Sequence, residues 1–374
     1  MAKKTESTMQ TSDFNMQRLS TKDLGETIAA TIAAGSNIAI FGRRGTGKTE
    51  ISKQEIAKAK MREIYVNLSV LERPDLGGYP RIMSSDMDRK FVDFLLPSMY
   101  EHLIEGNQKC VVLLDEVDKA DPSLWAPLLE FTQFHTINGR KLPNLHAIVM
   151  TGNLISEGGQ RPSLPLLDRA EKYIVEADAS AWLEWAGKGG KIHPSITAYI
   201  TDHPKDLFGA VDPEDRYADS SPRGWANASR LLFVGEDLGW SKDILNKKVS
   251  GCVGKEVGLK YSHYYDHYQV LLPLVNKIFE GQSVVEQFNA LEPTKKLVAC
   301  MIACARLANH LDDATKGKAP KSLEYVGKFL QKVPQENVLV SVRTQIQLSR
   351  IVTWDLDDNQ HWKPVLDKIT SAVY

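Results

Sequence analysis

The segment from Asn37 to Thr49, NIAIFGRRGTGKT, constrains the fold of this chain more than any other. It begins with a short apolar run, which predicts a buried strand. The run continues into a glycine-rich turn with the spacing G-x-x-x-x-G-K-[ST], and a helical pattern follows. A strand, a glycine turn and a helix in this order are typical of a loop that binds phosphate groups. The segment therefore predicts a nucleotide site.

Each residue type in the turn has a physical reason to be there. Glycines let the backbone adopt conformations closed to other residues, so that consecutive N–H groups can face a phosphate. The following helix adds unpaired N–H groups and the positive end of its dipole. The lysine would bind the β- and γ-phosphates, and the threonine hydroxyl would bind Mg²⁺. The predicted binding residues are Gly42, Arg43, Arg44, Gly45, Thr46, Gly47, Lys48 and Thr49.

A second motif lies about 65 residues further on, where the apolar run Cys110 to Leu114 is followed by Asp115 and Glu116. Such a run is typical of a strand buried on both faces of a parallel sheet. Asp115 can hold Mg²⁺, directly or through water, and Glu116 can polarise the water that attacks the γ-phosphate. An acidic pair after a strand is common, but after a phosphate loop it predicts the other half of a nucleotide site.

Apolar runs that predict strands alternate with helical patterns up to about residue 177. The chemical residues mostly follow the strands' carboxyl ends, which predicts a doubly wound α/β fold with a parallel sheet between helices. Residues 71–87 are predicted as a loop and Phe91 to Leu103 as a helix, and Asn138-Gly139 predicts a hairpin turn. Only helices are expected beyond residue 178. The predicted parts are a flexible N-terminal tail (1–22), the α/β core (23–177), a helical lid (178–280) and a C-terminal helical region (281–374).

With these motifs the chain resembles the AAA+ ATPases from about Leu24 to Val234, and in particular the MoxR branch, which is related to magnesium-chelatase subunits and McrB-type NTPases. The resemblance implies three further site residues. Asn153 in IVMTGN matches sensor 1, which places the attacking water; the usual form is nearer A-T-x-N, so Thr151 is the alternative. Arg169 in LPLLDR matches the arginine finger that reaches the neighbouring subunit's nucleotide. Arg223 in Ser-Pro-Arg matches sensor 2 of the lid.

The same resemblance implies how the protein works. ATP and Mg²⁺ are the expected cofactors, and a homo-hexameric ring is the expected assembly. The expected activity is ATP hydrolysis coupled to remodelling or assembly of a protein partner, such as a protein with a von Willebrand factor A domain. A helix-2 insert is expected near residues 76–78, and the Asn138-Gly139 hairpin takes the place of the family's pre-sensor-1 hairpin.

Composition leaves two other functions open. The net charge of -1 and the pI of about 6.8 do not indicate nucleic-acid binding, although a McrB-like, DNA-directed motor stays possible. A nucleotide-gated scaffold with little turnover is the second alternative, and the intact Asp115-Glu116 pair argues against it. No apolar run approaches the ~18 residues of a membrane-spanning helix. Four cysteines in 374 residues do not suggest a disulfide framework, so a cytoplasmic location is expected.

Overall fold

The computed structural model describes residues 16–84, 90–155, 160–176, 178–186, 192–209, 220–313, 320–333 and 359–371. The chain divides into two compact units, Met1–Ala177 and Asp178–Tyr374. The phosphate loop and the acidic pair both lie in the first unit.

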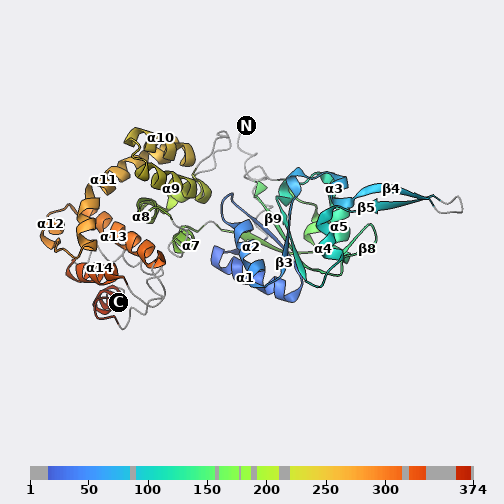
Figure 1. Cartoon of the computed structure of the whole chain (residues 1–374), viewed down its shortest axis with the longest axis horizontal. Helices are drawn as coiled ribbons and strands as arrows, with labels where there is room; N and C mark the ends of the chain where they lie inside the picture. The colour runs from blue at the N-terminus through green and yellow to red at the C-terminus, as the bar shows by residue number, and fades with distance from the viewer. Residues whose placement is uncertain are drawn as a thin grey trace, which may run out of the picture. The chain divides into compact units, whose positions relative to one another are not determined.

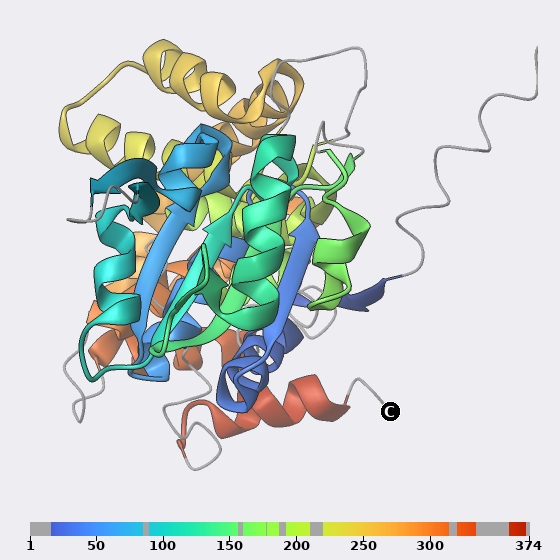
Figure 2. The same ribbon diagram turned by 90° about the vertical axis from the view of Figure 1, so that its right-hand side faces the viewer.

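A six-stranded parallel sheet forms the centre of the first unit (Figures 1 and 2). Its strands are β1 (Gln17–Leu19), β2 (Asn37–Gly42), β3 (Arg62–Asn67), β6 (Cys110–Asp115), β9 (Leu145–Gly152) and β10 (Glu171–Val175). They lie in the order β1-β10-β2-β9-β6-β3. Because every neighbouring pair is parallel, all the carboxyl ends meet at one edge of the sheet, where the chemical residues were expected.

Helices cover both faces of this sheet, as Figure 2 shows for α5. Successive residues of a strand point to opposite faces, so Ile38 and Ile40 face one core while Ala39 and Phe41 face the other. The first face is covered by α1 (Thr21–Ala34) and α2 (Lys48–Lys58), and the second by α4 (Glu101–Ile104), α5 (Trp125–Phe134) and α6 (Leu164–Leu167). The predicted fold class, a parallel sheet between helices followed by a helical region, is confirmed.

The predicted N-terminal tail, residues 1–22, is too long. Strand β1 pairs with β10 at the edge of the sheet, and α1 begins at Thr21. Ser20 caps this helix, because its hydroxyl accepts a hydrogen bond of 3.1 Å from the backbone N–H of Asp23. A three-residue edge strand is too short to show an alternating pattern, so β1 could not be predicted from the residues alone. Residues 1–15 of the predicted tail lie outside the described residues.

The prediction of a loop at 71–87 followed by a helix from Phe91 was wrong. Helix α3 (Arg73–Gly77) leads into an antiparallel hairpin of β4 (Tyr79–Ser84) and β5 (Lys90–Leu95), which projects from the first unit in Figure 1. Ile82 and Val92 face each other across this hairpin and are 72% and 61% exposed. Because the hairpin buries neither face deeply, its sequence lacks the alternation by which strands are recognised.

The predicted hairpin at Asn138-Gly139 is present as β7 (Thr136–Ile137) and β8 (Arg140–Lys141). Both turn residues have positive φ, 48° and 73°, as a two-residue hairpin turn requires. Arg140 donates from Nη2 to both carboxylate oxygens of Asp93 on β5, at 2.8 Å each. The two hairpins of the first unit are therefore joined by an ion pair.

The second unit is helical, and its described residues contain no strand. Its helices are α7 (Ala179–Trp185), α8 (Pro194–Asp202), α9 (Pro222–Asp237), α10 (Lys242–Val253), α11 (Lys255–Phe279), α12 (Val285–Asn289), α13 (Pro293–Asp313), α14 (Lys321–Lys332) and α16 (Lys363–Ser371). One buried cluster includes Val275 and Ile278 before the expected boundary at residue 280 and Val284 and Phe288 after it. The expected lid and C-terminal region thus share one core. None of the described helices is both long and apolar enough to cross a bilayer.

The contact between α10 and α11 gives a test of this core. A Cβ atom on Gly258 would lie 2.6 Å from Cα of Ser250, whereas a Cβ on Gly251 would meet nothing within 4 Å. Gly258→Ala should therefore destabilise the unit by about 1–3 kcal/mol and lower its melting temperature by several degrees. Gly251→Ala, on an exposed helical position, should instead add about 0.5–1 kcal/mol. Equal melting temperatures of the two variants would contradict this packing.

Candidate functional site

The phosphate loop joins the end of β2 to the start of α2. Gly45 and Gly47 have φ of 77° and 84°, conformations that other residues adopt only at a cost. Gly42 is required for a different reason, because a Cβ there would lie 2.9 Å from the carbonyl oxygen of Val175 on β10. Gly42 is the last residue of β2 and does not have a positive φ, so the expectation that it serves through backbone freedom was wrong. Close packing against β10 explains this glycine instead.

The side chain of Lys48 bends back over the loop and is 8% exposed. Its ammonium group donates to the carbonyl oxygens of Gly42 at 2.8 Å and Arg43 at 2.9 Å. Thr46 is also buried, and its hydroxyl donates to the carbonyl of Arg43 at 2.8 Å. Arg43 is half-buried and Arg44 exposed. A buried cation next to a glycine loop and a helix N-terminus fits the phosphates of a nucleotide.

Asp115 lies at the carboxyl end of β6 and meets the phosphate-loop helix. The hydroxyl of Thr49 lies 3.2 Å from Oδ1 and 3.1 Å from Oδ2 of this carboxylate. Thr151 on β9 and the backbone N–H of Glu116 also donate to Oδ1, at 2.5 and 3.0 Å. An alcohol and a carboxylate that converge beside a phosphate loop are the oxygen donors that Mg²⁺ prefers, so these residues fit the ion.

Glu116 follows in a left-handed backbone conformation with φ of 56°. Its carboxylate accepts a hydrogen bond of 3.0 Å from the ammonium group of Lys119 and another from Ser69. Partial burial acts to raise the pKa of Glu116, but the hydrogen bonds from Ser69 and Lys119 outweigh it and lower this pKa below its usual value. The side chain is therefore ionised at neutral pH, as a base must be.

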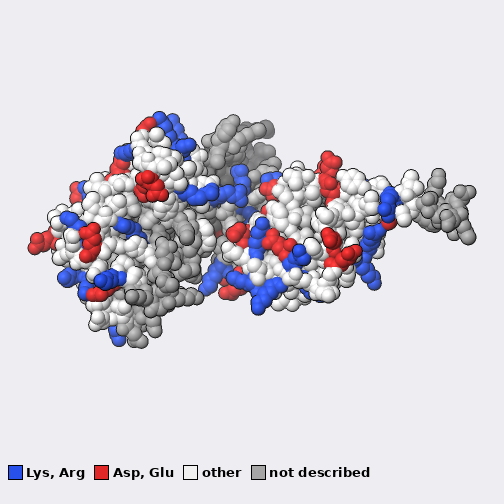
Figure 3. Space-filling model, viewed as in Figure 1, with Lys and Arg blue, Asp and Glu red and all other residues white. Residues whose placement is uncertain are grey.

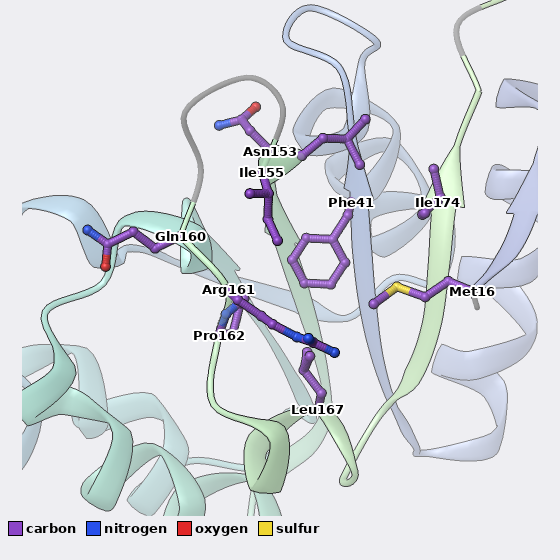
Figure 4. A pocket seen from close by; sticks show the side chains of 10 residues that line it. Met16, Phe41, Asn153, Ile155, Gln160, Arg161, Pro162, Leu167 and Ile174 are labelled. Carbon is purple, nitrogen blue, oxygen red and sulfur yellow. The ribbon is translucent and has the colours of Figure 1, made fainter. Parts of the chain in front are cut away.

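Asn153 follows the last residue of β9, and its amide donates to Oδ2 of Asp118 at 3.3 Å. Asp118 is 1% exposed, and its other oxygen has no hydrogen-bond partner. Asn153 lines a small cavity of about 30 Å³, together with side chains from β2, β10, α6, Met16 and the segments 154–155 and 160–162 (Figure 4). Asn153 therefore lies at the same edge of the sheet as Asp115, and one buried carboxylate orients its amide.

Arg169 lies at the opposite edge of the sheet from the phosphate loop. Its carbonyl accepts from the side chain of Asn37, the first residue of β2, at 3.2 Å. Strand β10 begins two residues after Arg169 and is roughly 13 Å long, and its last residue, Val175, pairs with Gly42 at the start of the phosphate loop. The guanidinium is held by Oε1 of Gln133, at 2.9 Å from Nε and 2.5 Å from Nη2. Arg169 is therefore not brought together with the other residues of the candidate site.

Arg223 belongs to the second unit, in the first turn of α9. Ser221 caps this helix by accepting from the N–H of Gly224 at 3.0 Å, and Pro222 occupies its first position. The Arg223 side chain is exposed. The assignment of Arg223 to sensor 2 stays a prediction.

Asp115 also contacts a side chain that no sequence motif indicated. Tyr65 on β3 donates from its hydroxyl to Oδ2 of Asp115 at 3.0 Å. Partial burial and the neighbouring negative charge of Asp115 raise the pKa of Tyr65 to about 12. The register of β3 on β6, in which Asn67 pairs with Asp115, brings Tyr65 within reach. No local pattern around Tyr65 indicates its contact with Asp115. A tyrosine near the end of a strand predicted to neighbour the strand of the acidic pair could have suggested such a contact.

Comparison with known proteins gave structural neighbours only. No family model and no curated protein matches the chain. NtrX from Brucella abortus is 18% identical over 57% of this chain and 50% of its own, with a TM-score of 0.35. Its complex with ADP is 17% identical over 82% and 65%, with a TM-score of 0.39. The RuvB Holliday junction branch migration motor of Thermotoga maritima is 12% identical over 65% and 67%, with a TM-score of 0.32.

The chain thus spans half to two thirds of the length of these neighbours. At such identities and TM-scores the similarity is partial, so the function proposed below rests on the residues of the site.

The hydrogen bond between Lys119 and Glu116 gives a test of the charge balance at the site. Lys119→Met removes a donor and a positive charge, so the pKa of Glu116 should rise. Lys119→Arg keeps the charge and should leave this pKa low. NMR titration of the side-chain carboxyl carbons, with the Glu116 signal identified by its loss in Glu116→Gln, measures the change. An unchanged or lower pKa in Lys119→Met would contradict the arrangement.

Proposed function

We propose that this chain is a Mg²⁺-dependent AAA+ ATPase that hydrolyses ATP to ADP and phosphate. The observation that carries the proposal is the contact of Thr49 with Asp115, at 3.1 and 3.2 Å, although 66 positions separate them in the sequence. The contact brings the phosphate loop, the Asp115 carboxylate and the neighbouring Glu116 to one edge of the sheet. Phosphoryl transfer needs these three parts within reach of one another.

Each part has one role in this mechanism. The loop N–H groups and Lys48 bind the phosphates, and Thr49 and Asp115 would hold Mg²⁺, which neutralises charge on the phosphate oxygens when bound. Glu116 takes a proton from water as the water oxygen bonds to the γ-phosphorus. The bond from that phosphorus to the bridging oxygen breaks, and ADP keeps the electron pair. Asn153 orients the water.

Arg169 acts in a neighbouring copy of the chain. Its place at the amino ends of the strands keeps it away from the phosphate loop of its own subunit, at the other edge of the sheet. In a ring with head-to-tail contacts, the amino edge of one subunit can face the site of the next. Arg169 then stabilises charge on the transferred phosphoryl group in trans. We propose a homo-hexameric ring on this basis.

We further propose that Arg223 senses the γ-phosphate from the helical unit and couples hydrolysis to movement of that unit. The order of the motifs and the Ser-Pro-Arg start of α9 support a MoxR-like ATPase that remodels a protein partner. A protein with a von Willebrand factor A domain is the partner we propose. A cytoplasmic location suits this role. Cationic and anionic side chains are interspersed on the face in Figure 3, which favours a protein partner over nucleic acid.

The role of Glu116 can be tested by Glu116→Gln. The amide keeps the shape of the side chain but cannot accept the proton, so the rate of phosphate release should fall by about 10²–10⁴. Binding of a fluorescent ATP analogue should stay within a few-fold of the unchanged protein. Lys48→Ala is the matched control, because it should lose binding and hydrolysis together. Normal turnover in Glu116→Gln would overturn the mechanism.

Mixing of variants tests whether Arg169 acts in trans. Arg169→Ala should bind ATP but lose about 10³–10⁵ in kcat, and Lys48→Ala should be inactive for want of ATP. In rings mixed from equal amounts of the two variants, about a quarter of the interfaces join the intact nucleotide site of an Arg169→Ala subunit to the intact Arg169 of a Lys48→Ala subunit. The rate of phosphate release should recover in proportion to these interfaces. No recovery in rings shown to be mixed would exclude the trans role.

A further inference from the structure

Tyr65 contacts the nucleotide site and has no role in the mechanism so far. Its hydroxyl donates to Oδ2 of Asp115 at 3.0 Å, and its side chain is 44% exposed. An exposed tyrosine loses little by facing water, so packing in the core does not explain why this hydroxyl is turned to the carboxylate.

The ring of Tyr65 is held in place from the phosphate-loop helix. Nζ of Lys53 on α2 lies 4.4 Å from the centre of the ring, in the geometry of a cation–π contact. The same ammonium group lies 3.7 Å from the carboxylate of Glu63 on β3. Tyr65 is therefore fixed between β3 and the helix that carries Thr49.

The two oxygens of Asp115 are held in different ways. Oδ1 accepts from the backbone N–H of Glu116 and from Thr151 as well as from Thr49. Among the described residues, Oδ2 accepts hydrogen bonds only from Thr49 and Tyr65. When the Thr49 hydroxyl turns to bind a cation, two donors still hold Oδ1, and Tyr65 alone holds Oδ2. The hydrogen bond from Tyr65 then sets the orientation of Oδ2.

We propose that Tyr65 is a positioning residue of the magnesium site, which orients Oδ2 of Asp115 toward the ion or its bound water and so sets the affinity for Mg²⁺ rather than for the nucleotide. Groups that hydrogen-bond to metal ligands commonly change metal affinity by about 10–100-fold. The nucleotide phosphates are bound by the loop amides and Lys48, none of which Tyr65 contacts in the described structure. The inference rests on the proposed role of Asp115 in holding Mg²⁺.

Tyr65→Phe is the variant that tests this inference, because it removes the hydroxyl and leaves the ring under Lys53. Binding of a fluorescent ADP analogue is measured in EDTA and then over a series of free Mg²⁺ concentrations, with no turnover involved. The affinity for the ADP analogue in EDTA should stay within twofold of that of the unchanged protein. The Mg²⁺ midpoint, which is the free Mg²⁺ concentration that gives half of the full change in ADP binding, should rise about tenfold. Tyr79→Phe, on the β4–β5 hairpin and 57% exposed, is the matched control and should change neither value.

Asp115→Asn separates the two levels of the proposal. It should raise the Mg²⁺ midpoint itself, and adding Tyr65→Phe to it should cause little further change, because the hydroxyl acts through Asp115. If Asp115→Asn shifts the midpoint and Tyr65→Phe does not, the role of Tyr65 is wrong and that of Asp115 stands. If Asp115→Asn leaves the midpoint unchanged, both roles are wrong. A Tyr65→Phe protein that binds ADP more weakly in EDTA by the same factor would also overturn the inference.

Discussion

The hydrogen bond between Thr49 and Asp115 depends on the parallel register of the central sheet. Strands β2 and β6 are not neighbours, since β9 lies between them, so their backbones are about 9.6 Å apart. Thr49 spans part of this gap from the first turn of α2, and Thr151 on β9 donates to the same carboxylate from between them. A slip of one residue in either strand pairing would turn Asp115 to the other face of the sheet. The buried apolar residues that fix the register therefore also fix the site.

Hydrogen bonds within the first unit hold the charged side chains of the site. Lys48 is bound to loop carbonyls, and Glu116 is bound to Lys119 and Ser69. A nucleotide would replace the carbonyl partners of Lys48 with phosphate oxygens, whereas Glu116 must share its carboxylate between its present donors and a water molecule. Under the proposed function, Arg169, at the far edge of the sheet, completes this chemistry from another copy of the chain. Under the proposed function, one subunit therefore carries half of a site at each edge of its sheet.

The two hairpins show where sequence patterns fail. The β7–β8 turn was predictable because Asn138 and Gly139 are residue types that tolerate positive φ, a local property. The β4–β5 hairpin was missed because its strands lie largely in solvent, as the exposure of Ile82 and Val92 shows, and burial on one face is what produces alternation. Strand β1 was missed because an edge strand of three residues is held by its neighbour β10 and not by its own pattern.

The sequence by itself determined the strand, loop and helix from Asn37 to Thr49 and the acidic pair after Cys110 to Leu114. It also determined that strands alternate with helices along the first unit, which makes the sheet parallel. These are local features, in which residue type, spacing and period contain the information. Only the tertiary structure decided that Tyr65 and Thr151 contact Asp115, that Asp118 orients Asn153, and that Arg169 lies at the opposite edge from the loop. Those relations depend on strand order and register, which arise from the packing of segments far apart in the chain.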